Sequence, residues 1–257
     1  MRKINIRAYK NHLRKSERVR RNLMPQKKPH GVYELKQYRE YTLVFRDRIH
    51  AGDILASMLY PYVQDKHLVL GIPAGGVPVG VVVAETLHVP FDVAVVSKIT
   101  LPWNTEAGYG AVAFDGTVRL NKALMARIRL TDAEIQEGIK KTTAKVNRRI
   151  KKLRKKHPFP ALSGQSTIIV DDGLASGFTM LVAVEALKKA GANHIIVAVP
   201  TAHKESLDAI VSEVDAVFCP NIRSGLRYAV ADAYERWSDV DESEVLKILK
   251  GVWEASP

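Results

Sequence analysis

Two acids, followed by a run of small and hydroxyl-bearing residues, come after an apolar segment in the second half of the chain. Residues 168–170 indicate a buried strand, and Asp171 and Asp172 follow it directly. Carboxylates accept hydrogen bonds from hydroxyls, and a small-residue loop that opens a helix directs backbone N–H groups at an anion. That loop comprises Gly173, Leu174, Ala175, Ser176, Gly177, Phe178 and Thr179. A diol beside a phosphate is the chemistry of a ribose 5-phosphate; the simpler alternative is an acid pair that caps the next helix.

A second glycine-rich segment occupies the same kind of position. Residues 71–80 read GIPAGGVPVG and lie between an apolar strand pattern at 68–71 and an apolar helix pattern at 77–87. Gly75 and Gly76 allow backbone amides to approach a polyphosphate closely. Taken alone, such a segment is more often an ordinary turn between a strand and a helix. The prediction of a phosphate site therefore depends on the two loops together.

Residues 171–179 resemble the signature of type I phosphoribosyltransferases, which bind phosphoribosyl pyrophosphate (PRPP). The resemblance implies that Asp171 and Asp172 hold the ribose 2′ and 3′ hydroxyls and that residues 174–179 bind the 5-phosphate. It also implies a Mg²⁺ ion that bridges the hydroxyls and the pyrophosphate. The two acids would meet this ion indirectly, through ribose hydroxyls or water. Phe178 stands where many members have a small residue.

Segment 71–80 is similar to the pyrophosphate loop of the same family. That loop often contains a non-proline cis peptide bond. The resemblance makes Ala74, Gly75 and Gly76 substrate-binding residues. Relatives often carry a basic residue where Ala74 stands, so this loop lacks one charge that would meet the leaving pyrophosphate. Lys98, at the end of the next apolar strand, is the candidate that compensates.

Residues 98–121 show little periodicity before Gly110. In type I enzymes a flexible loop at this point closes over PRPP and excludes water, which would intercept an oxocarbenium-like transition state. The resemblance therefore implies a mobile lid here, with Glu106 and Trp103 as residues that contact substrate on closure. A surface loop or hairpin with an incidental acid is an equally good interpretation.

The wider pattern predicts an α/β fold. The chain has 257 residues, 46% of them hydrophobic and 26% charged, which is enough for a large core. Apolar strand patterns alternate with helical ones, which favours a mainly parallel twisted sheet flanked by helices, with ligands at the carboxyl ends of the strands. The expected strands lie at 67–71, 91–97, 166–171, 194–199 and 215–219. We expect two parts: a basic N-terminal extension at 1–36, and a phosphoribosyltransferase-like domain at 37–257 that includes a small C-terminal hood.

Positive charge is concentrated at the N-terminus. Residues 1–36 hold twelve Lys or Arg against Glu17 and Glu34, which accounts for +10 of the formal net charge of +12. Such an arm would contact nucleic acid, an acidic partner or a neighbouring subunit; a solvated extension is at least as good an interpretation. Together with the habit of the family, the arm also makes a homodimer an expectation.

A second basic segment, residues 131–157, has the pattern of a long helix. Thr131 and Glu134 form a possible capping box, and apolar residues recur on one face. The remaining positions hold Lys140, Lys141, Lys145, Arg148, Arg149, Lys151, Lys152, Arg154, Lys155 and Lys156. A solvated helix face is the first expectation, and contact with RNA or phosphate-rich ligands is the minor alternative.

The resemblance covers residues 43–248 and points to a poorly characterised branch of bacterial and archaeal phosphoribosyltransferases. It includes the run Arg46-Asp47-Arg48 in a first helix expected at 46–63, and it leaves residues 1–36 outside. Aromatic residues near the C-terminus are candidates for an acceptor-binding hood, although core packing is the slightly favoured role. They are Tyr228, Tyr234 and Trp237.

The sequence thus predicts an enzyme that transfers ribose 5-phosphate from PRPP to a nitrogenous acceptor, a nucleobase or related amine, and releases pyrophosphate. The main alternative is a PRPP-sensing, nucleic-acid-binding regulator without catalysis, and a third is a hydrolase or phosphorylase of ribose-phosphate compounds. The single Cys219 excludes an internal disulfide. No apolar run is long enough to span a membrane and none has the layout of a signal peptide, so we expect a cytoplasmic protein.

Overall fold

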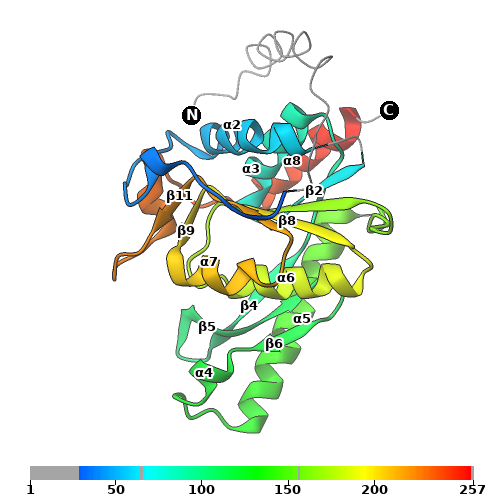
Figure 1. The fold of residues 1–257 in the computed structure, drawn as a ribbon. Coiled ribbons are helices and arrows are strands. Elements are labelled where there is room, and N and C mark those ends of the chain that lie inside the picture. Colours follow the sequence, from blue (N-terminus) through cyan, green and yellow to red (C-terminus); the bar gives the residue numbers. More distant parts are fainter. Residues whose placement is uncertain (1–28, 64–65, 156, 256–257) are drawn as a thin grey trace.

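The computed structural model describes residues 29–63, 66–155 and 157–255 (Figure 1). Its centre is a six-stranded sheet in the order β1-β10-β8-β7-β2-β3, in which every pair is parallel. The strands are β1 (Gly31–Tyr33), β10 (Ala216–Phe218), β8 (His194–Ala198), β7 (Ser166–Val170), β2 (His67–Gly71) and β3 (Phe91–Val93). The predicted parallel α/β sheet is confirmed.

One expected strand, at 91–97, is two strands in the structure. The chain leaves the central sheet after β3, and β4 (Val96–Leu101) starts a separate antiparallel sheet in the order β4-β5-β6. Its other strands are β5 (Asn104–Ala113) and β6 (Val118–Leu120). The segment expected to lack regular structure up to Gly110 is therefore a hairpin, which is the alternative that the sequence left open.

Helices cover both faces of the central sheet, and most residues of its strands β2, β3, β7, β8 and β10 are buried. On β2, Leu68 and Leu70 face one apolar core, and Val69 faces the other. The core on the Val69 side includes residues of α2 (Arg48–Leu59), α3 (Gly76–Leu87) and α8 (Glu242–Ala255). The core on the Leu68 side lies under α6 (Phe178–Lys189) and α7 (Lys204–Val211), on the opposite side of the sheet (Figure 1). In the part of the chain that the structure describes, no helix has the length and apolar character needed to cross a membrane.

The long helix expected at 131–157 is α5 (Asp132–Arg154), which follows the short helix α4 (Lys122–Met125). The predicted capping box is present: Glu134 N–H donates to the Thr131 hydroxyl, and Thr131 N–H donates to the Glu134 carboxylate. Two of the basic residues expected on its solvent face are buried instead. Arg154 forms an ion pair with Asp92, and Arg149 one with Glu242.

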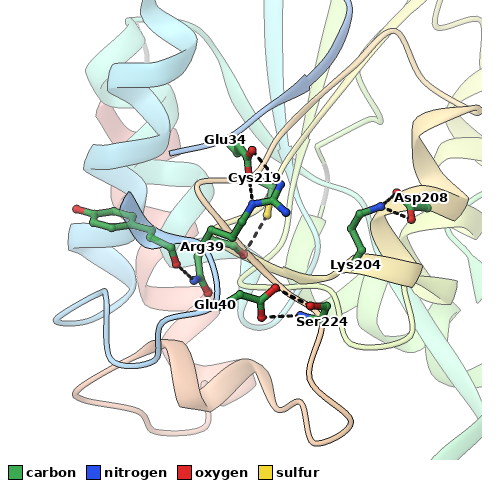
Figure 2. A network of polar contacts seen from close by, with 9 residues as sticks. Glu34, Arg39, Glu40, Lys204, Asp208, Cys219 and Ser224 are labelled. Carbon is green, nitrogen blue, oxygen red and sulfur yellow. Dashed lines mark hydrogen bonds and ion pairs between the residues drawn. The ribbon is translucent and has the colours of Figure 1, made fainter. Parts of the chain in front are cut away.

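The first described strand, β1, forms the edge of the central sheet opposite to β3. Strand β1 lies within the predicted extension 1–36 and pairs with β10, and η2 (Lys36–Tyr38) follows it. Figure 2 shows the polar contacts that hold this stretch: Glu34 accepts from Arg39, and Glu40 accepts from Ser224, next to β11 (Asn221–Arg223). Residues 29–40 are thus attached to the domain, whereas residues 1–28 lie outside the described residues.

Beyond the carboxyl ends of the central strands lies a small second layer. Strand β11 pairs in parallel with β9 (Thr201–His203), and η4 (Val230–Ala233) lies nearby. A further 3-10 turn, η3 (Tyr60–Tyr62), ends the α2 segment. The segment for which the sequence predicted a small hood includes β11 and η4, and its role as a hood stays a prediction.

Candidate functional site

The two predicted loops emerge side by side. Strands β2 and β7 are neighbours with Gly71 opposite Val170, so the segments that follow them leave the same edge of the sheet. A Cβ atom built on Gly75 would lie 1.9 Å from Asp172 Oδ2, and one on Gly76 would lie 2.5 Å from the Val170 carbonyl oxygen. The glycines of one loop are therefore packed directly on the acids of the other, and the Pro73–Ala74 peptide between them and β2 is cis.

The acid pair sits in a mostly buried position. Asp171 accepts a hydrogen bond from the backbone N–H of Asp172 (2.9 Å), and the Asp172 side chain is only 16% exposed. Burial, together with the negative charge of Asp172, raises the pKa of Asp171 well above its usual range. Burial also raises the pKa of Asp172, against the opposing effect of the Arg48 cation. Both shifts mean that a second negative charge on this pair costs more than the first.

Arg48 is a site residue to which the sequence analysis assigned no role. It begins α2, and its Nε and Nη2 atoms both donate to Asp172 Oδ2 (2.9 and 2.8 Å). Its Nη1 atom donates to the Ser238 carbonyl (2.8 Å), and its guanidinium lies 3.9 Å from the centre of the Trp237 ring. Tyr234 adds a hydrogen bond from its hydroxyl to the Asp172 carbonyl (2.6 Å). The acidic end of β7 is thus fixed by residues from both ends of the domain.

The loop after the acids is fixed by β9. Leu174 N–H donates to the Thr201 carbonyl (2.9 Å), and His203 N–H donates to the Leu174 carbonyl (3.0 Å). Gly177 has φ +67°, a conformation that favours glycine, and a Cβ there would also be a tight 3.2 Å from the Ser206 carbonyl oxygen. Because helix α6 begins at the next residue, its first backbone N–H groups have no partner within the helix. They face the loop in which a phosphate was predicted.

Two side chains of this loop differ in exposure. Ser176 is exposed, and its hydroxyl accepts from the backbone N–H of Phe178 (3.4 Å). The Phe178 ring is half-buried and packs against the core beneath α6. The aromatic ring at this position therefore extends the core, and it leaves the exposed side of the loop to Ala175 and Ser176.

Lys98 and Glu106 lie on the antiparallel sheet and not on either loop. Lys98 is an exposed residue of β4, opposite Ala111, and its side chain runs along Gly108 of β5. The prediction placed Lys98 at the end of the preceding strand, which is wrong, because β4 continues to Leu101. Glu106 belongs to β5, but its side chain lies outside the part that the structure describes. The contacts of these two residues with substrate stay predictions.

A polar cluster includes residues of β9, which pairs with Leu174, and of β11. Thr201 donates to Asn221 (2.7 Å), and Tyr228 donates to Thr201 (3.2 Å). Burial raises the pKa of Tyr228 to about 12, and the Arg223 guanidinium lies 4.4 Å from the centre of its ring. Tyr234 is 2% exposed and belongs to a small core with Phe45, so the interpretation of core packing is confirmed for this aromatic residue.

The donor set at the acid pair fits Mg²⁺ only in company with a substrate. Among the described residues, no three His, Cys, Asp or Glu side chains are placed to hold a metal ion. Asp171 and Asp172 supply two hard oxygen donors at one point. Mg²⁺ usually keeps several waters and is completed by phosphate oxygens of a substrate, so these acids would hold it through ribose hydroxyls or water.

Comparisons with known proteins agree with this geometry. A model of the phosphoribosyl transferase domain matches residues 47–233. Two curated proteins of Mycobacterium tuberculosis, MT0597 of strain CDC 1551 / Oshkosh and Rv0571c of strain ATCC 25618 / H37Rv, are provisionally named phosphoribosyl transferases. Each is 32% identical to this chain over 206 residues. The match covers 80% of this chain and 46% of each relative, so the chain spans about half the length of these relatives.

A solved structure is similar over almost its full length. TT1426 from Thermus thermophilus is 30% identical, with a TM-score of 0.67, and the match covers 80% of this chain and 98% of TT1426. The chain therefore belongs to the phosphoribosyl transferase family, as the resemblance of residues 171–179 implied.

Proposed function

We propose that this protein is a phosphoribosyltransferase that transfers ribose 5-phosphate from PRPP to a nitrogenous acceptor, a nucleobase or related amine. The observation that carries the proposal is the direct packing of Gly75 on Asp172. It joins a loop suited to pyrophosphate and an acid pair suited to a ribose diol. PRPP carries its pyrophosphate on C1 and its hydroxyls on the neighbouring C2 and C3, so a single molecule would fill both halves of the site.

The chemistry would be positional and electrostatic. Asp171 and Asp172 would accept hydrogen bonds from the ribose hydroxyls, residues 174–179 would hold the 5-phosphate, and Gly75 and Gly76 would admit the pyrophosphate. The bond from C1 to the pyrophosphate oxygen breaks as the bond from C1 to the acceptor nitrogen forms, without a covalent enzyme intermediate. Mg²⁺, when bound, would neutralise charge on the leaving pyrophosphate.

Strands β4 and β5 are proposed to act as the lid over this site. Their turn presents Trp103, which is 63% exposed, and the pairing of the two strands changes register between Ile99 and Leu101. A hairpin with irregular pairing near its end can bend more easily than a continuous ladder. We propose that Glu106 and Trp103 approach the substrate when this hairpin closes.

Calorimetric titration of PRPP into the purified protein, with and without Mg²⁺ and at two salt concentrations, tests the proposal. We expect binding that requires Mg²⁺, followed by pyrophosphate release when the correct nitrogenous acceptor is added. Binding without release for any acceptor in a panel of purines, pyrimidines and amines would favour a regulator over an enzyme. No binding under any condition would contradict the site itself.

The basic N-terminal segment favours a second candidate, a PRPP-sensing protein that binds nucleic acid. Residues 1–36 carry a formal charge of +10. Because β1 is part of the sheet, the deletion that separates the two functions is residues 1–28 and not 1–36. An enzyme should keep its turnover after this deletion, whereas a regulator should lose its affinity for nucleic acid, with a steep dependence on salt before the deletion.

A further inference from the structure

The segment that would receive pyrophosphate carries no charge of its own. Residues 71–80 contain only glycine, proline, alanine, isoleucine and valine. Pyrophosphate is strongly anionic, and backbone amides alone stabilise such a group less well than amides combined with a cation. A cation that meets the pyrophosphate would come from another part of the fold. Lys98, the residue that the sequence suggested for this charge, lies on strand β4, so we also consider the cation nearest to the acid that Gly75 contacts.

Arg48 binds the acid on which Gly75 packs. Its Nε and Nη2 atoms bind Asp172 Oδ2, which is the same oxygen that a Cβ on Gly75 would meet at 1.9 Å. One carboxylate oxygen thus binds the guanidinium and also lies beside the backbone of the glycine loop. Helices α2 and α3 pack against each other, so the residue that begins α2 stays beside the loop that begins α3.

The guanidinium is held in a defined plane and still has donors to offer. Arginine has five N–H donors, and three are accounted for by two bonds to Asp172 and one to the Ser238 carbonyl. Trp237 covers one face of the group at 3.9 Å, and the side chain is only 11% exposed. A largely desolvated cation whose plane is fixed in this way suits bidentate recognition of phosphate oxygens.

A purely structural ion pair would explain the contact with Asp172 but not the rest of the arrangement. Pairing alone requires one donor on the carboxylate, whereas here the cation is also fixed by an aromatic face and a backbone carbonyl from the C-terminal part of the chain. We propose that Arg48 binds the pyrophosphate group of PRPP, in place of the cation that segment 71–80 lacks. This inference rests on the proposed function and adds the residue that recognises the leaving group.

The test compares two probes on three variants. Arg48→Met keeps much of the side-chain stem without the charge, Arg48→Lys keeps the charge without the planar fork, and Arg46→Met removes an exposed arginine two residues earlier. Titrations with inorganic pyrophosphate and with ribose 5-phosphate, both with Mg²⁺, report separately on the two halves of the site. Thermal unfolding of each variant shows whether it is folded at the temperature of the titration.

We expect Arg48→Met to weaken pyrophosphate binding by about tenfold or more, the loss typical of one charge-assisted hydrogen bond. The pyrophosphate affinity of Arg48→Lys should lie between that of Arg48→Met and that of the native protein. Its affinity for ribose 5-phosphate should change by less than about threefold. Arg46→Met should leave both affinities within about twofold. If Arg48→Met does not fold, the test uses Arg48→Lys, which should lose pyrophosphate affinity while keeping its affinity for ribose 5-phosphate.

Equal losses for pyrophosphate and ribose 5-phosphate would overturn the inference, because they would show that Arg48 acts only through Asp172. Unchanged pyrophosphate binding in folded Arg48→Met or Arg48→Lys would also overturn it. If the proposed function itself is wrong, the native protein should bind neither PRPP nor pyrophosphate. That result would also overturn the inference about Arg48.

Discussion

Gly75 and Asp172 belong to loops far apart in the sequence, yet a Cβ atom on Gly75 would lie 1.9 Å from the Asp172 Oδ2 oxygen. The backbone of Gly75 has φ −62° and ψ −31°, which any residue adopts. Glycine is therefore required here for the space that its missing side chain leaves, and not for its conformational freedom. The two halves of the proposed substrate site are matched to each other through this one position.

Changing Gly75 to alanine should disrupt the site. The added methyl group would displace the Asp172 carboxylate. This carboxylate has little freedom to move, because Arg48 binds it and the aspartate side chain is short. We expect the free energy of unfolding to fall by about 1–3 kcal/mol, the usual cost of overpacking, and PRPP affinity to fall by about tenfold or more, the loss of one charged hydrogen bond. Urea unfolding and calorimetric titration measure the two effects.

Gly251→Ala is the matched control for this change. Gly251 lies on the exposed side of α8, and a Cβ there would meet nothing within 4 Å. Alanine should raise the free energy of unfolding by about 0.5–1 kcal/mol without affecting PRPP binding. Equal PRPP affinity in the Gly75 and Gly251 variants would contradict the role given to the Gly75–Asp172 contact.

Replacing both acids with asparagine should abolish turnover and leave the fold intact. The double change Asp171→Asn and Asp172→Asn keeps the shape of the two side chains but removes the charge that would hold the ribose hydroxyls and Mg²⁺. We expect pyrophosphate release to fall by about a hundredfold or more, as when a positioned charge is lost from an active site. Circular dichroism and the rate of pyrophosphate release are the measurements, and undiminished release would remove both acids from the mechanism.

Much of the fold and the two loops could be predicted from the sequence, because both depend on local patterns. Apolar runs followed by small residues located β2, β7 and the helices α3 and α6 to within a few residues. The parallel arrangement followed from the alternation of strands and helices, which allows few topologies. The acid pair and the glycine loop needed only the rule that such loops meet at the carboxyl edge of the sheet.

The contacts that join distant segments could not be predicted in this way. Arg48 meets Asp172 across 124 residues, and nothing in the local pattern around it separates it from the neighbouring Arg46. Arg149 and Arg154 were expected in solvent because arginine is usually exposed on a helix. Their partners, Glu242 and Asp92, lie on other elements and become visible only in three dimensions.

The elevated pKa of Asp171 predicts a pH-dependent stability in the protein without ligands. Burial and the charge of Asp172 favour the protonated form in the folded state. The stabilisation that Asp171 contributes is therefore fully present below its unfolded pKa of about 3.9 and is lost as pH rises through the higher folded value. We expect Asp171→Asn to be more stable than the native protein at neutral pH, with a difference that narrows on acidification.

Urea unfolding of the native and Asp171→Asn proteins at a series of pH values measures that difference. Asp208→Asn, on the exposed helix α7, controls for the removal of one negative charge from the protein. A stability difference that is constant with pH, or one that widens toward acid, would show that Asp171 is not held in its protonated form by the fold.

The buried pair of Arg154 and Asp92 should be among the most sensitive positions for stability. Arg154 Nη1 and Nη2 donate to the two oxygens of Asp92 (2.5 and 2.9 Å), and the side chains are only 5% and 12% exposed. Arg154→Met leaves Asp92 buried without its partner, so we expect a loss of about 3–5 kcal/mol in the free energy of unfolding by urea. Adding Asp92→Asn should recover part of this loss, and Lys151→Met on the exposed face of α5 should change stability by less than about 0.5 kcal/mol. A loss in Arg154→Met no larger than that in Lys151→Met would mean that water reaches Asp92 and that the pair does not fix α5 to β3.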